Sequence, residues 1–87
     1  MTRRKLERTD ELVDIIMGTL AGQEPEVQGA IIANLVAMFI AGHAPPLRKE
    51  AKELLLQCVN ELIPICVSGM IEKGRVPPEW REKIGLQ

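Results

Sequence analysis

Apolar residues recur every three or four positions along this chain, and no segment shows the strict alternation of a β-strand. The first such segment has its polar side at Glu11 and Asp14. Its apolar stripe consists of Leu12, Val13, Ile16, Met17 and Leu20. This spacing predicts an amphipathic helix that is capped by Thr9 or Asp10 and ends at Gly22.

The second predicted helix has no charged side chain between Gly29 and Gly42, and Asn34 is its one clearly polar residue. Pro25 suits the first helical position, and Gly42 is expected to end the helix in a left-handed conformation. Large apolar side chains cover more than half of the circumference, and small ones cover the rest. A helix that is apolar on all sides has to be buried on all sides.

Four small residues of this second helix lie four positions apart and form one ridge: Gly29, Ala33, Ala37 and Ala41. Small residues at this spacing let two helix backbones approach closely. Because three short helices are too few to cover a central helix on all sides, we expect a homodimer. Its predicted interface consists of Gly29, Ala33, Val36, Ala37, Ile40 and Ala41. The alternative is that the ridge packs against the first and third helices of the same chain.

A third helix is predicted to begin near Pro46, since Ala44 and Pro45 each precede a proline. Its buried side is predicted to include Leu55, Cys58, Leu62 and Cys66 among others. Pro64 falls on its polar side. Because proline lacks a backbone N–H, the helix either bends at Pro64 and keeps its apolar face or splits there. Gly74 ends this helix, and 77–84 is predicted to form one or two turns of terminal helix.

The predicted fold is therefore all-α. It is a small bundle of three main helices, the third bent or split at Pro64, plus a short C-terminal helix. Residues 1–8 are expected to be a basic N-terminal tail, and 9–87 a single all-α domain. A chain of 87 residues buries only about 60–65% of its unfolded surface, which leaves it marginally stable alone.

Charge is distributed unevenly, although the net charge is only −1. Residues 1–8 are basic, 9–47 contain acidic side chains with no Lys or Arg, and the remainder is nearly balanced. Arg48, Lys49 and Lys52 lie in the first turns of the third helix, where they oppose the helix dipole. We expect them to pair with acidic side chains. The alternative is a candidate patch for an anionic partner.

Cys58 and Cys66 are eight residues apart in one helical segment, or about 12 Å along its axis. They cannot bridge each other there, so we expect reduced thiols in a cytoplasmic protein. No secretory signal follows the basic start. The longest charge-free stretch begins at Val27, and its apolar part ends at Gly42. This part is shorter than the roughly 20 residues that a membrane span needs, so no span is expected.

Candidate chemistry is sparse. His43 is the one histidine and Ser68 the one serine, and no metal-ligand spacing or phosphate-binding loop occurs. We therefore expect no catalytic residues, no cofactor and no metal site. Trp80 is expected to dock the terminal turn onto the core, with a role as a partner anchor as the alternative.

These observations predict a non-enzymatic homodimer that acts as a protein–protein interaction or regulatory module. We do not expect a nucleic-acid partner. One alternative is nonetheless a DNA- or RNA-binding regulator that uses the basic tail with Arg48, Lys49 and Lys52. Another is a small-molecule binder or enzyme with an aliphatic pocket near His43.

Overall fold

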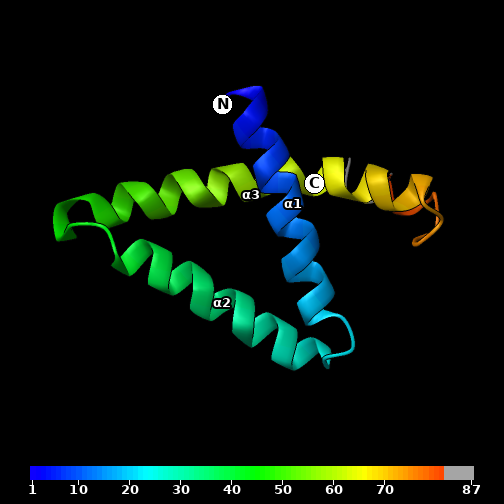
Figure 1. Cartoon of the computed structure of the whole chain (residues 1–87), viewed down its shortest axis with the longest axis horizontal. Helices are drawn as coiled ribbons and strands as arrows, with labels where there is room; N and C mark the ends of the chain where they lie inside the picture. The colour runs from blue at the N-terminus through cyan, green and yellow to red at the C-terminus, as the bar shows by residue number, and fades with distance from the viewer. Residues whose placement is uncertain (82–87) are drawn as a thin grey trace. The chain divides into compact units, whose positions relative to one another are not determined.

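A computed structural model describes residues 1–81 of the chain (Figure 1). Its elements are α1 (Arg3–Leu20), α2 (Pro25–Ala41), the short 3-10 helix η1 (Pro45–Leu47) and α3 (Arg48–Glu72). No strand occurs within the described residues, so the all-α prediction is confirmed. The chain divides into two compact units, Met1–Phe39 and Ile40–Gln87, with the boundary inside α2.

In the first unit, α1 begins earlier than predicted. Thr2 is the N-cap, because its hydroxyl oxygen accepts a hydrogen bond from the Lys5 N–H at 3.2 Å. The expected cap at Thr9 or Asp10 is therefore wrong, and the basic tail expected over residues 1–8 is helical from Arg3 onwards. The Thr9 hydroxyl instead donates to the Lys5 carbonyl within the helix, at 2.7 Å.

Two ion pairs along α1 explain why its basic start is helical. Arg3 pairs with Glu7 at 3.2 Å, and Arg8 pairs with Glu11 at 2.8 Å. Pairs spaced three or four residues apart each stabilise a helix by about 0.2–0.5 kcal/mol. The positive charge of this segment is thus partly balanced within the helix itself.

The predicted stop at Gly22 is confirmed, since its φ is +87°, a conformation that glycine adopts without a steric penalty. The Gln23 N–H donates to the Leu20 carbonyl at 3.1 Å, and the Gln28 side-chain amide donates to the same carbonyl at 2.9 Å. The first turn of α2 is thereby tied to the last turn of α1. Leu20, at 4% exposure, is buried at this junction.

The predicted left-handed stop at Gly42 is wrong, because Gly42 has no positive φ. The α2 carbonyls find other donors. The His43 N–H donates to the Ile40 carbonyl at 3.1 Å. The Arg48 guanidinium donates to the carbonyls of Ala41 and His43, both at 3.1 Å. The Arg48 guanidinium thus satisfies terminal carbonyls of the helix, as a left-handed glycine motif does at many helix ends, and its charge suits the negative end of the helix dipole.

We expect Arg48→Ala to lower the free energy of unfolding by about 1 kcal/mol, because two carbonyls at the end of α2 lose their donor. Urea unfolding followed by circular dichroism measures the change. Lys49→Ala is the matched control, since the side chain of Lys49 makes no hydrogen bond or ion pair within residues 1–81. Equal midpoints for the two variants would show that Arg48 does not stabilise this turn.

In the second unit, α3 starts at Arg48 rather than near Pro46, because Pro45 and Pro46 form η1 first. It is one helix of 25 residues that contains Pro64, so it does not split at the proline. The predicted stop at Gly74 is confirmed by its φ of +72°. The Arg75 N–H then donates to the Met70 carbonyl at 2.9 Å, closing the helix end.

The predicted C-terminal helix over 77–84 lies partly outside the described residues. Within them, the Trp80 N–H donates to the Pro77 carbonyl at 3.1 Å, and the Arg81 N–H donates to the Pro78 carbonyl at 3.2 Å. These bonds form a single turn. The helical bundle and the terminal helix therefore remain predictions.

Candidate functional site

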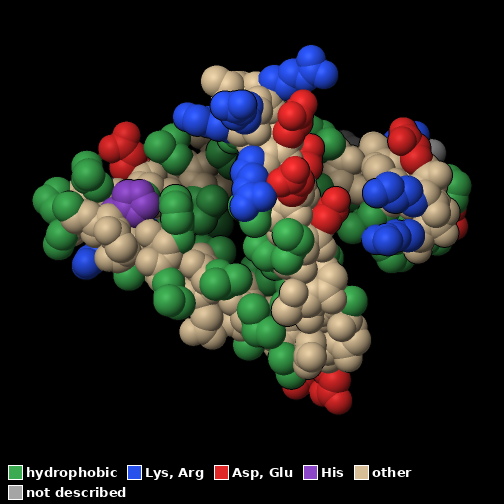
Figure 2. All heavy atoms as spheres, in the orientation of Figure 1, with side chains coloured by type: hydrophobic (Ala, Val, Ile, Leu, Met, Phe, Trp, Pro, Cys, Tyr) green, Lys and Arg blue, Asp and Glu red, His purple; other side chains and the backbone are tan. Residues whose placement is uncertain are grey.

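Apolar side chains lie on the surface of both units (Figure 2). Among the described residues Leu20 alone is buried. On α2, Met38 is 69% exposed and Phe39 is 56% exposed; on α3, Ile65 is 65% exposed. Neither unit therefore has a hydrophobic core of its own within residues 1–81, and the candidate functional site is a set of uncovered helix faces.

The six residues of the predicted dimer interface all lie on α2, where the helix brings them to one side. Val36 and Ile40 are partly exposed, and the small-residue ridge of Gly29, Ala33, Ala37 and Ala41 is exposed. A Cβ atom added at Gly29 would meet nothing within 4 Å. The ridge is consequently open to the close approach of another helix.

Asn34 makes a hydrogen bond within α2, a point that the sequence prediction missed. Its side-chain amide donates to the Ala30 carbonyl of the same helix at 2.8 Å. This bond satisfies one N–H of the one clearly polar side chain between Gly29 and Gly42. The signal in the sequence is an Asn inside a predicted helix, where its amide can donate to the carbonyl four residues earlier.

The structure separates the three residues of the candidate anionic-partner patch by role. Arg48 is held at the end of α2 by its two carbonyl acceptors. Lys49 and Lys52 are exposed on α3. Both ion pairs found within residues 1–81 lie on α1. Trp80, the candidate partner anchor, is 46% exposed.

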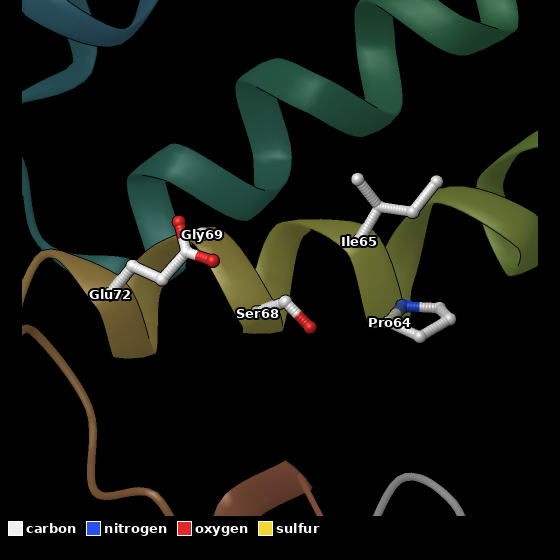
Figure 3. Close-up of a pocket in the computed structure, with 5 residues that line it drawn as sticks. All are labelled: Pro64, Ile65, Ser68, Gly69 and Glu72. Atoms are coloured by element: carbon white, nitrogen blue, oxygen red, sulfur yellow. The ribbon is translucent and has the colours of Figure 1, made fainter.

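A hollow of about 480 Å³ runs along one side of α3 (Figure 3). It is lined by Pro64, Ile65, Ser68, Gly69 and Glu72, and His43 is not among them. Figure 3 shows Ser68 and Glu72 pointing in different directions, so their oxygens do not converge on a common point. Nowhere in the described part do three metal-binding side chains cluster.

The helical stretch Pro45–Glu72 is long and apolar enough to cross a membrane, judged by length and composition alone. Its most apolar window has a mean hydropathy of 1.7. The sequence prediction considered the longest stretch without Asp, Glu, Lys or Arg, whose apolar part lies at α2 and is shorter, and passed over this helix, which contains Glu61. A charged residue such as Glu61 is costly inside a bilayer.

Comparison with known proteins returns no match: no protein-family model, no curated protein and no solved structure is similar to this chain. The exposed apolar side chains of α2 and α3 are the features of the molecule that bear on its function.

Proposed function

We propose that this protein is a non-enzymatic homodimer of the cytoplasm that acts as a protein–protein interaction or regulatory module. The observation that carries this proposal is the uncovered apolar surface. Within residues 1–81 Leu20 alone is buried, and Met38, Phe39 and Ile65 are each more than half exposed.

Obligate homodimers bury large, mainly apolar interfaces of about 2,000–5,000 Å² in total, which is the kind of cover that these side chains lack. Most helix stability in proteins comes from tertiary packing of an apolar face rather than from helix propensity. A second copy supplies the packing that each unit lacks.

Helix α2 is the face best suited to this contact. It carries no charge from Val27 to Ala41, its Asn34 amide has an internal acceptor, and Gly29 leaves room for a neighbouring backbone. A symmetric dimer presents the same patch from both chains, so a self-complementary ridge is sufficient. The partner of the assembled module would then contact surface that remains outside the dimer.

Sedimentation equilibrium of the reduced full chain tests the proposal. At micromolar concentration we expect a mass of twice 9.7 kDa. We further expect Gly29→Ala to weaken the dimer about tenfold, because a methyl group at a close backbone contact costs about 1–3 kcal/mol. A folded wild-type monomer at micromolar concentration would contradict the proposal.

Gly18→Ala is the matched control. Both glycines lie within helices, and an added Cβ meets nothing within 4 Å at either site. Alanine therefore favours each helix by about 0.5–1 kcal/mol. Gly18 lies on the polar side of α1, so its substitution should leave dimerisation unchanged. If both variants dimerise like wild type, close contact at Gly29 is wrong.

A further inference from the structure

We draw no further inference here: the strongest candidate, the exposed apolar face of α3 around Val59 and Leu62, carries none because nothing in the structure shows what covers it.

Discussion

The Ala37→Glu variant is expected to lose the dimer, with a dissociation constant at least about 100-fold higher than that of wild type. Ala37 lies in the middle of the small-residue ridge on α2, and a carboxylate there has no cationic partner on the same helix. Burying an uncompensated charge costs about 3–5 kcal/mol, and a symmetric dimer buries two. Sedimentation velocity over a dilution series measures the dissociation constant.

Asn60→Glu is the matched control for Ala37→Glu. It adds the same single negative charge to a helix but on the polar side of α3, with no acidic residue three or four positions away. We expect this variant to dimerise like wild type. If Ala37→Glu also stays dimeric and folded, the ridge is not buried, and the proposed interface on α2 is wrong.

Diluting the wild-type protein is expected to unfold it, because within residues 1–81 neither unit has a hydrophobic core and folding of the proposed dimer is therefore coupled to association. For such a dimer, a 100-fold fall in concentration removes about 2.7 kcal/mol of stability. With the usual unfolding entropy of two chains of this size, the midpoint of thermal unfolding falls by about 7 °C. Thermal unfolding followed by circular dichroism at about 0.5 and about 50 µM protein measures this shift.

A compact monomer gives the opposite result, since its melting temperature does not depend on concentration. Ala37→Glu is the internal comparison. If it is a weakened dimer, its melting temperature should depend on concentration as that of wild type does but lie lower throughout. A concentration-independent midpoint for wild type would show that the chain covers its own apolar faces.

Local chemistry made much of the fold predictable from sequence. Helical periodicity predicted α1, α2 and α3, and the glycine stops at Gly22 and Gly74 were right because glycine adopts a positive φ without a steric penalty. The start of α1 was wrong because positive charge was taken to indicate a tail. The pairing of Arg3 with Glu7 by spacing, together with the cap at Thr2, could have shown a helix there.

A contact across the proline turn explains the error at Gly42. Gly42 was predicted to end α2 in a left-handed conformation, but Arg48 caps that helix from the far side of a proline turn. Nothing in the residues around Gly42 signals this bond. The role of Arg48 likewise could not be separated from those of Lys49 and Lys52 by charge alone.

The sequence by itself determined the helical class of this protein, its charge-free second helix and the residues of the small ridge, because all of these follow from side-chain size and spacing. Only the tertiary structure decided which side chains are exposed: the small ridge is exposed, and Leu20 alone is buried among residues 1–81. The physical reason is that burial depends on which helices meet, and short amphipathic segments do not encode their neighbours in local periodicity.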